Sequence, residues 1–431
     1  MARQILGETS VNTFNDMALP APLKRALEKL QFNTPTPIQS AAISLAMEGK
    51  DLVGSAQTGS GKTAAFCLPS LAKILSKPDQ RILVLAPTRE LALQIKDVAR
   101  DLSQFCSHIR LCLLIGGASM GAQFKNLRGQ PNFVVATPGR LLDHFKRKSI
   151  HLKDFETIIL DEADRMLDMG FAPAINQILA ELPQERQTLL FSATLPPQIL
   201  KMTKDFMKSP EWVEVKKEKG SEPKIEITTI EVPGAEKNER ILAELSQRHG
   251  SILVFARTKI RTDRLAKFLN QSGLKASAIH GGRSQSQRLQ ALRRFRDGDS
   301  SILVATDVAS RGIDIPSIGL VVNFDLPQTR EDYIHRIGRT ARAGASGEAL
   351  SFITPEEKSH WRMLTGEKSQ RSQRFERSDR GSDFQKRRPF KKRRRFSAAS
   401  TPKSGGFKIF SAFRKKDRAE KQSAQKHRSA R

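Results

Sequence analysis

The chain has 431 residues, of which 73 are Lys or Arg and 45 are Asp or Glu, so its formal charge is +28. This length exceeds one ordinary domain and suits two domains plus an appendage, at roughly 150 residues per domain. So large an excess of positive charge indicates a polyanionic partner, and nucleic acid is the first expectation.

Membrane and disulfide classes are also disfavoured. No run reaches the roughly 18 consecutive apolar residues of a membrane span, and the amino terminus lacks the basic-then-apolar pattern of a signal peptide. Cys67, Cys106 and Cys112 are scattered and form no CxxC pair. Small buried positions in a reducing compartment suit them better than metal ligation or a disulfide. We therefore expect a soluble, cytoplasmic protein without a membrane partner.

Short apolar runs recur along the first half of the chain, each followed by a polar or glycine-containing loop. Runs without polar alternation are typical of parallel strands that are buried on both faces. Helical patterns such as residues 90–105 lie between them, so the repeating unit is βα and the sheet is parallel. The runs that we predict as strands are 82–85, 133–136, 157–160 and 188–191.

The same pattern begins again in the second half, at 251–255, 301–305 and 320–324. A charged stretch with glycine and proline separates the two halves and is typical of a linker. We predict an α/β fold of two tandem domains with parallel sheets, followed by a disordered basic tail. The predicted boundaries are 1–40 for an amino-terminal segment, 41–210 for the first domain, 211–225 for the linker, 226–365 for the second domain and 366–431 for the tail.

The tail carries most of the net charge. Residues 366–431 hold 23 basic and 6 acidic residues, and phenylalanines such as Phe390 and Phe396 flank the basic cluster 391–395. Basic groups that meet phosphates and rings that stack on bases suit single-stranded nucleic acid. A solvated charge run or a basic targeting signal is the alternative interpretation.

A glycine-rich stretch follows the apolar pair at 52–53 and precedes a helical pattern at 64–75. Backbone N–H groups of such a loop face an anion, Lys62 would reach the β and γ phosphates, and the Thr63 hydroxyl would hold Mg²⁺. Ala56 stands at the first glycine of the pattern GxxxxGK[ST], and a match to so loose a pattern can arise by chance. The predicted ATP-binding residues of this loop are Ala56, Gln57, Thr58, Gly59, Ser60, Gly61, Lys62 and Thr63.

Two acidic residues, Asp161 and Glu162, follow the predicted strand 157–160, at the strand end where ligands of open α/β sheets bind. Asp161 would hold Mg²⁺, partly through water, and Glu162 would orient and polarise the attacking water. The alternative is an acid-decorated helix start, which the helix dipole favours in any case. The upstream phosphate loop favours the catalytic interpretation.

Arginines in the second half supply positive charge of the kind that phosphoryl transfer requires. Arg339 and Arg342 lie three residues apart, so on a helix both project the same way. A solvated basic face is the usual meaning of such a pair. The competing meaning is an arginine finger that reaches the γ-phosphate when two domains close.

With these residues in place, the chain resembles the DEAD-box RNA helicases of superfamily 2, which have two RecA-like domains, over about residues 12 to 355. The resemblance rests on many segments in one order rather than on a single match. The matching segments are Phe14, 31–39, 56–63, 87–92, 116–117, 137–140, the Asp-Glu-Ala-Asp tetrad at 161–164, 192–194, 254–257, Gln285 with Arg288, 305–307, 311–314 and 333–342.

The resemblance implies a role for each matching residue. In the family, Gln39 would hydrogen-bond adenine while Phe14 stacks on the ring, and Asp314 would contact the ribose. Lys62, Asp161, Glu162, Arg339 and Arg342 would be catalytic. The residues that would couple hydrolysis to domain movement are Asp164, Ser192, Thr194 and His335.

RNA would be bound through loops of both domains, largely at the sugar-phosphate backbone, so the core is not expected to read sequence. The implied RNA-binding residues are Pro87, Thr88, Arg89, Gly117, Thr137, Arg140, Arg257, Gly281 and Thr306.

Departures from the family pattern are mild. Gln31 and Ala341 stand where the family usually has glycine, and Gly282 stands where an aspartate commonly follows His-Gly. The polar tail begins soon after 361–364, so the helix that usually closes the second domain is expected to be short or missing.

The function that we predict is ATP-dependent RNA helicase activity, which unwinds short RNA duplexes or remodels RNA–protein complexes with ATP and Mg²⁺. The organisation of the chain, a compact core followed by one basic tail, resembles that of bacterial members that act in ribosome assembly or RNA decay. Ribosomal precursor particles or decay enzymes are therefore expected partners, and the protein is expected to be a monomer. Two alternatives stay open: a DNA helicase or translocase, and an ATP-gated RNA clamp or ribonucleoprotein scaffold with little unwinding.

Overall fold

The structure is a computed structural model that describes residues 13–56, 59–215, 224–310, 318–341 and 346–366. The predicted basic tail, apart from Gly366, lies outside the described residues. None of the helices in these ranges has the length and apolar character needed to cross a lipid bilayer.

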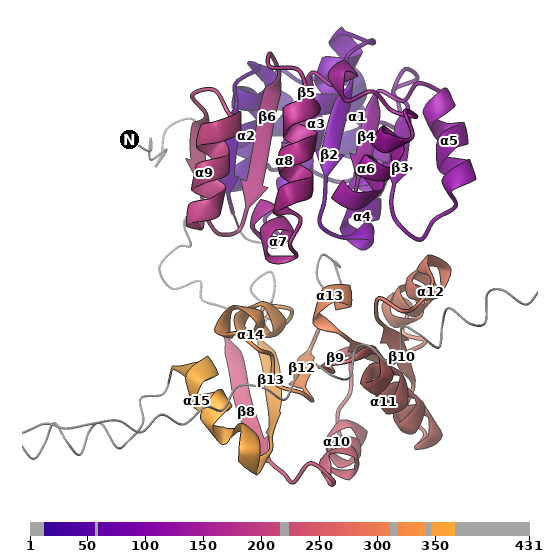
Figure 1. The fold of residues 1–431 in the computed structure, drawn as a ribbon, viewed down its shortest axis with the longest axis vertical. Helices are drawn as coiled ribbons and strands as arrows, with labels where there is room; N and C mark the ends of the chain where they lie inside the picture. The colour runs from indigo at the N-terminus through magenta and orange to yellow at the C-terminus, as the bar shows by residue number, and fades with distance from the viewer. Residues whose placement is uncertain (1–12, 57–58, 216–223, 311–317, 342–345, 367–431) are drawn as a thin grey trace, which may run out of the picture. The chain divides into compact units, whose positions relative to one another are not determined.

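The first half of the chain forms a seven-stranded parallel sheet with the order β3-β4-β2-β5-β6-β1-β7 (Figure 1). Four predicted strands are confirmed, because β2, β4 and β5 have the predicted bounds and β6 extends the prediction by one residue at each end. The strands are β1 (Leu52–Ser55), β2 (Ile82–Leu85), β3 (Leu111–Leu114), β4 (Phe133–Ala136), β5 (Thr157–Leu160), β6 (Gln187–Ser192) and β7 (Glu211–Glu214).

Helices cover both faces of this sheet, which explains why its strands are apolar throughout. In β2, Ile82 and Val84 pack with one group of helices (α1 to α4), whereas Leu83 and Leu85 pack with the other (α6 to α9). Full burial of each such side chain contributes roughly 1.5–3 kcal/mol. The helices are η1 (Phe14–Asp16), α1 (Ala21–Lys29), α2 (Pro37–Met47), α3 (Lys62–Ser76), α4 (Arg89–Leu102), α5 (Met120–Arg128), α6 (Pro138–Lys146), η2 (Leu152–Asp154), α7 (Ala163–Asp168), α8 (Ala172–Glu181) and α9 (Pro197–Phe206).

The second half forms a six-stranded parallel sheet with the order β10-β11-β9-β12-β13-β8. The strands are β8 (Ile225–Glu231), β9 (Ile252–Phe255), β10 (Ala276–Ile279), β11 (Ile302–Ala305), β12 (Leu320–Asn323) and β13 (Gly347–Ile353). The helices are α10 (Lys237–Ser246), α11 (Lys259–Gln271), α12 (Gln285–Arg296), α13 (Asp307–Ser310), α14 (Arg330–Ile337), η3 (Pro355–Glu357) and α15 (Lys358–Thr365).

The linker prediction of 211–225 was wrong at its first end. Residues 211–214 are β7, which pairs in parallel with β1 and buries Val213. Glutamates at both ends of the strand made it look like a connector, but an edge strand tolerates charge on its open side. Ile225, the last residue of the predicted linker, is the first residue of β8.

The closing helix of the second domain is short, as the sequence suggested. α15 has eight residues, buries Leu364 and ends at Gly366 in the left-handed conformation. Trp361 packs edge-on against Tyr333 of α14, with the ring centroids 5.3 Å apart. This contact between two aromatic rings holds the short helix α15 against α14.

A polar cluster joins α2, α3 and β6 at the edge of the first sheet where β6 begins. Gln187 donates to the carbonyls of Ala46 (2.9 Å) and Lys50 (2.7 Å) and accepts from Lys73 Nζ. Burial lowers the pKa of Lys73 to about 8. Asp51 accepts from the backbone N–H of Thr188 at 2.7 Å in the same region.

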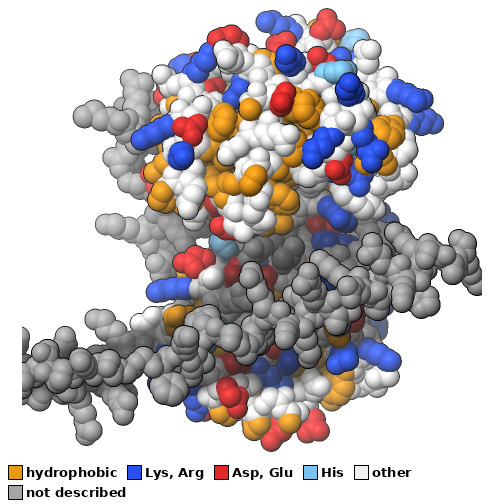
Figure 2. Space-filling view, viewed as in Figure 1, with side chains coloured by type: hydrophobic (Ala, Val, Ile, Leu, Met, Phe, Trp, Pro, Cys, Tyr) orange, Lys and Arg blue, Asp and Glu red, His pale blue; other side chains and the backbone are white. Residues whose placement is uncertain are grey.

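Apolar side chains gather on the visible face of the first sheet's helices, over α8 and α9 (Figure 2). Leu200 is 40% exposed there, while Phe171 and Leu195 are partly buried against the core.

Candidate nucleotide and RNA site

Three neighbouring strands of the first sheet, β5, β6 and β1, bring the predicted ATP-site residues together. The phosphate loop follows β1, the acidic pair follows β5, and Ser192 ends β6, which lies between them. Because all three strands are parallel, their carboxyl ends meet at one edge of the sheet. Segments more than 100 residues apart in sequence thus form one site.

The phosphate loop leads directly into α3, which begins at Lys62. The Lys62 side chain is 6% exposed, and its Nζ donates to the Ala56 carbonyl at 2.8 Å, so the ammonium lies across the loop. Gly61 has a φ of 90°, and a Cβ there would approach Thr36 Oγ1 to 3.0 Å. Gly59, Ser60 and Thr63 lie in the described part of the loop, whereas Gln57 and Thr58 lie outside it.

Gln39 supports this loop from α2. Its amide nitrogen donates to the Gly61 carbonyl at 3.0 Å, and its amide oxygen accepts from the Thr36 backbone at 2.8 Å. Thr36 Oγ1 donates to the Ser60 carbonyl at 2.8 Å. Sequence reasoning assigned no role to Thr36, although Thr-x-x-Gln before an apolar run is a capping-box pattern that could have revealed it.

Phe14 lies in the first 3-10 helix and is 4% exposed, packed in the apolar core beside α1 and α2. Its backbone N–H donates to the Asn33 carbonyl at 3.4 Å, which holds the segment around 31–39. The adenine contacts assigned to Phe14 and Gln39 stay predictions.

Asp161 lies at the end of β5 and is 3% exposed. Burial raises the pKa of Asp161 to about 7; the Lys62 ammonium opposes this shift, and the Glu162 carboxylate adds to it. A buried carboxylate that is incompletely neutralised suits a cation. Mg²⁺ binds through one or two carboxylates plus water and substrate phosphates, so Asp161 and the Thr63 hydroxyl fit a Mg²⁺ site.

Glu162 is the residue before α7 and adopts a left-handed backbone, with φ 51° and ψ 51°. Such a conformation is costly for a residue with a side chain and clusters at functional sites. Arg165 pairs with the Glu162 carboxylate, and both side chains are about nine-tenths buried. Arg165 was missed by sequence reasoning, and its i, i+3 spacing from Glu162 is the signal that could have found it.

Asp164 links this acidic segment to the end of β6. Its Oδ2 accepts from both the backbone N–H and the hydroxyl of Thr194, each at 2.8 Å. Ser192 Oγ donates to the Thr194 carbonyl at 2.6 Å and accepts from the Asp164 N–H at 3.3 Å. The structure therefore brings three of the four predicted coupling residues into one hydrogen-bonded group.

The predicted RNA-binding loops of the first domain follow β2, β3 and β4, on the same sheet edge. Gly117 has a φ of 78°, and the Arg89 guanidinium lies against it, so a Cβ there would overlap Arg89. Arg140 Nη1 donates to the Ala118 carbonyl at 3.2 Å. Thr137 N–H donates to the Leu114 carbonyl at 3.0 Å, which joins the third loop to β3.

Thr88 caps α4, with its hydroxyl accepting from the Leu91 N–H at 3.2 Å. It follows Pro87, so the loop after β2 turns directly into the helix. The neighbouring Glu90 pairs with Arg288 at 2.7 Å and accepts from Gln285 at 3.3 Å. Both partners belong to the second-domain segments that carried the family resemblance.

In the second half, the predicted RNA-binding residues also follow strands. Arg257 follows β9; its side chain is 54% exposed and lies 3.4 Å from Glu357. Thr306 follows β11, and its N–H donates to the Ile279 carbonyl at 3.3 Å. Gly281 follows β10.

His280 fixes the loop around Gly281. Its Nε2 lies 2.9 Å from Asp263, and its Nδ1 accepts from the Gly282 N–H at 3.2 Å. Burial alone would raise the pKa of Asp263, yet hydrogen bonds from Arg283 and His280 lower it. The loop is thus held by an ionised carboxylate.

The predicted arginine segment contains both buried and exposed side chains. Arg336 is 2% exposed, forms a two-point ion pair with Asp307 and donates to Asn323 at 3.0 Å, so its role is to hold α14 on the sheet. Arg339 follows α14 and is 7% exposed, whereas His335 is exposed on the helix. Arg342 and Asp314 lie outside the described residues.

Both positions where the family usually has glycine have a left-handed backbone. Gln31 has a φ of 60° and Ala341 has a φ of 54°. Glycine adopts this region without steric cost, whereas other residues pay roughly 1–2 kcal/mol. The family preference therefore has a local steric cause, and this chain accepts the strain.

Comparisons with known proteins agree with this geometry. The profile of the DEAD/DEAH box helicase family matches residues 36–203, and that of the helicase conserved C-terminal domain matches residues 236–344. The DEAD-box ATP-dependent RNA helicase CshA of Bacillus subtilis is 44% identical over 354 residues, which cover 82% of this chain and 72% of that protein. The ATP-dependent RNA helicase CshA of Listeria monocytogenes is 43% identical over 353 residues, which cover 81% and 68%.

Solved helicase structures contain similar RecA-like α/β domains. Saccharomyces cerevisiae Dbp5 bound to RNA and ADP BeF3 matches with a TM-score of 0.73 at 30% identity, over 82% of this chain and 92% of that chain. Mss116p bound to ssRNA and AMP-PNP matches with a TM-score of 0.72 at 29% identity, over 83% and 77%. The chain belongs to the DEAD-box family of ATP-dependent RNA helicases.

Proposed function

We propose that this helicase couples Mg²⁺-dependent ATP hydrolysis to the local separation of short RNA duplexes or the remodelling of RNA–protein complexes, in ribosome assembly or RNA decay. The observation that carries the proposal is the bonding of Asp164 to Thr194, because it joins the acidic pair of the ATP site to the segment after β6. A motor requires such a link, whereas a simple nucleotide-binding domain does not.

The ATP site supplies positioning and charge. Lys62, whose ammonium lies across the phosphate loop, would neutralise the β and γ phosphates, and Glu162, whose carboxylate Arg165 holds, would orient and polarise the attacking water. Asp161 and Thr63 would hold Mg²⁺, which would supply positive charge to the phosphates. Gln39 keeps the loop in shape through Gly61, and the adenine edge is its second proposed partner.

The second domain completes the site on closure. Arg339 and Arg342 act as fingers on the γ-phosphate, Asp314 contacts the ribose, and His335 lies at the domain interface. ATP and RNA favour the closed state because each binds residues of both domains, which is the differential affinity that shifts such an equilibrium. Hydrolysis removes one of the two ligands that hold the cleft closed, so the strand is released.

RNA occupies the loops that follow β2, β3 and β4 of the first sheet and β9, β10 and β11 of the second. The proposed contacts are Pro87, Thr88, Arg89, Gly117, Thr137, Arg140, Arg257, Gly281 and Thr306. These loops offer backbone N–H groups and guanidinium groups, which bind phosphates and do not read bases. The basic tail adds affinity, and we propose that the active protein is a cytoplasmic monomer.

The proposal is tested with three proteins and two substrates. Wild type, Lys62→Ala and Glu162→Gln are assayed for ATP hydrolysis with RNA or with DNA of the same sequence, and for displacement of one strand of a short RNA duplex. We expect RNA alone to stimulate the wild type, no turnover by Lys62→Ala, and RNA retention without turnover by Glu162→Gln.

Three results separate the alternatives. Equal stimulation by DNA would favour a DNA translocase. RNA-stimulated hydrolysis without strand displacement would favour an ATP-gated clamp. Full hydrolysis by Glu162→Gln would refute its assignment as the residue that activates water.

A further inference from the structure

A cavity of about 380 Å³ opens in the first domain at the sheet edge opposite the ATP site. Residues just before β2, β4 and β5 line it, namely Arg81, Pro131 and Phe155, together with the end of α5 and the segment between α6 and η2. The phosphate loop and the acidic pair lie at the carboxyl ends of the strands. The volume lies within the range of roughly 300–1,000 Å³ that is usual for ligand pockets.

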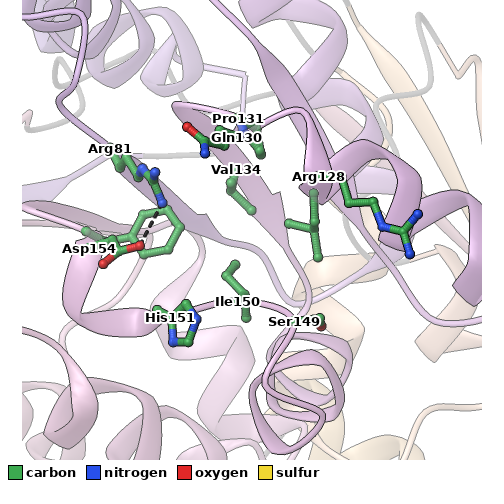
Figure 3. A pocket seen from close by; sticks show the side chains of 11 residues that line it. Arg81, Arg128, Gln130, Pro131, Val134, Ser149, Ile150, His151 and Asp154 are labelled. Carbon is green, nitrogen blue, oxygen red and sulfur yellow. Dashed lines mark hydrogen bonds and ion pairs between the residues drawn. The ribbon is translucent and has the colours of Figure 1, made fainter.

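The lining has an apolar centre and a polar rim. Figure 3 shows Val134 and Ile150 in the middle, with Arg81 and Asp154 on one side and Arg128 on the other. Val134 is fully buried beneath the cavity, whereas Ile150 is 7% exposed and Leu127, near the end of α5, is only partly buried. An apolar group of a ligand that enters the cavity therefore displaces water from apolar side chains, which favours binding.

The rim holds hydrogen-bond donors that the protein itself does not use. Arg81 is paired with Asp154 at 2.7 Å, so these two charges cancel. In the described part of the chain, the side chains of Arg128, Gln130 and His151 have no hydrogen-bond or ion-pair partner. The rim thus offers one uncompensated guanidinium, one amide and one imidazole around an apolar floor.

We propose that this cavity is a docking site for an acidic peptide segment of a partner protein, which places an apolar side chain on Leu127 and Ile150 and a neighbouring carboxylate on Arg128. A carboxylate accepts a two-point hydrogen bond from a guanidinium, and such charge-assisted bonds are about twice as strong as neutral ones. The Gln130 amide and the His151 ring donate to the remaining oxygens or to the peptide backbone.

The charge balance favours a single carboxylate over a nucleotide or RNA. With Arg81 neutralised, Arg128 is the remaining full positive charge of the rim, and the Asp154 carboxylate on the same rim repels a polyphosphate. Phe155, the aromatic residue of the lining, is 2% exposed and offers no face on which a base could stack. RNA recognition by stacking or by a row of basic residues is therefore disfavoured here.

The cavity lies at the opposite ends of the strands from the proposed ATP and RNA contacts, so a partner can bind there without blocking them. A partner bound at the amino ends of the strands leaves the ATP and RNA edge open, so the motor can work while it is attached to an assembly. Arg128 is exposed at the end of α5 and belongs to none of the proposed ATP or RNA contacts.

Binding of short peptides to the full chain tests the proposal. The probe is acetyl-Gly-Asp-Leu-Phe-amide, compared with the Asn version, with a version in which Leu and Phe are Ala, and with the Asn version carrying a free carboxyl end. Calorimetry at about 0.1 M salt, where the Debye length is about 10 Å, limits non-specific attraction by the basic tail. Methyl NMR reports which side chains the peptide touches.

Arg128→Glu and Lys125→Glu form a matched pair, because both reverse a charge on the exposed surface of α5 and only Arg128 lines the cavity. We expect Arg128→Glu to weaken binding of the Asp peptide about tenfold, an equivalent of ~1.4 kcal/mol. Lys125→Glu should leave the affinity within about twofold, and RNA-stimulated ATP hydrolysis should be unchanged in both variants. The Leu127 and Ile150 methyl signals should shift on peptide addition.

The peptide series identifies the chemistry. Loss of affinity with the Asn and the Ala versions supports the site, and recovery with the free carboxyl end shows that a chain terminus is an equally good source of the carboxylate. Equal weakening by the two charge reversals would overturn the proposal, since it would show general electrostatic attraction. Absence of binding, or methyl shifts away from Leu127 and Ile150, would overturn it as well.

Discussion

Replacing Thr194 with valine removes one of the two hydrogen bonds that tie the segment after β6 to Asp164. The Thr194 hydroxyl and backbone N–H both lie 2.8 Å from Asp164 Oδ2, and valine keeps the shape and the N–H while it deletes the hydroxyl. A hydrogen bond to a charged acceptor contributes about 1.5–3 kcal/mol. Because Thr194 is exposed and one bond persists, the lower figure applies.

A loss of about 1.5 kcal/mol is roughly a tenfold change in the equilibrium between linked and unlinked arrangements. We therefore expect the number of duplexes separated per ATP hydrolysed to fall about tenfold, while RNA-stimulated hydrolysis is largely kept. The assay measures ATP turnover with saturating RNA and strand displacement on one short duplex, with the same protein preparation. The ratio of the two rates is the reported quantity.

The control is Thr203→Val, which deletes a hydroxyl bonded to the Leu200 carbonyl at 2.8 Å on α9, away from the site. Its ratio should match the wild type. Asp164→Asn completes a double-mutant cycle with Thr194→Val, and the two effects should be less than additive because the asparagine weakens the same bond that the valine removes. Equal ratios in the two valine variants, or full additivity in the cycle, would refute the linking role of Asp164.

Three other predictions address pH, the tail and backbone strain. Burial lowers the pKa of Lys73 from its usual 10.5 to about 8, so between these two pH values the unfolded chain binds more protons than the folded chain. The free energy of unfolding of the wild type, measured with urea, should therefore increase relative to that of Lys73→Met as the pH rises from about 8 to 10.5. Removal of residues 367–431 keeps Gly366 as the cap of α15 and should lower RNA affinity. The slope of log affinity against log salt concentration should become less steep by about 0.7 per lost phosphate contact. A slope equal to that of the wild type would assign the tail another role. Gln31→Gly should raise the free energy of unfolding by about 0.5–1 kcal/mol, because the relief of left-handed backbone strain exceeds the entropy that glycine adds to the unfolded chain. The control is Gln184→Gly, at a loop residue without positive φ, which should lower the free energy of unfolding.

Most of the central strands, though not β1 and β13, could be predicted from the sequence because burial on both faces leaves a continuous apolar run. β2, β4 and β5 have the predicted bounds for this reason. The edge strands could not. β7 was assigned to the linker, and β8 reads Ile-Glu-Ile-Thr-Thr-Ile-Glu with most of its residues exposed. These two edge strands are partly exposed and carry charged residues, so their sequences resemble connectors, whereas the edge strands β3 and β10 are largely buried.

The candidate site shows a similar division. The positions of Lys62, Asp161 and Glu162 after β1 and β5 could be predicted, because the chemistry proposed for them needs particular residue types after particular strands. The supporting contacts of Thr36 and Arg165 depend on how α2 and α7 meet their neighbours, which no motif alone specifies. The steric cause of the family glycines also required φ values, since a sequence shows only that Gln31 and Ala341 differ.

The order of strands explains how RNA and ATP can act on each other within one domain. The edge of the first sheet reads β3-β4-β2 and then β5-β6-β1, so the proposed RNA loops occupy one half and the ATP site the other. The halves meet between β2 and β5, where the Asp161 N–H donates to the Leu85 carbonyl at 3.0 Å. Leu85 lies two residues before Pro87, the start of the proposed RNA contacts. We propose that a shift of that loop on RNA binding would reach Asp161, the proposed Mg²⁺ ligand, through one hydrogen bond and a two-residue segment.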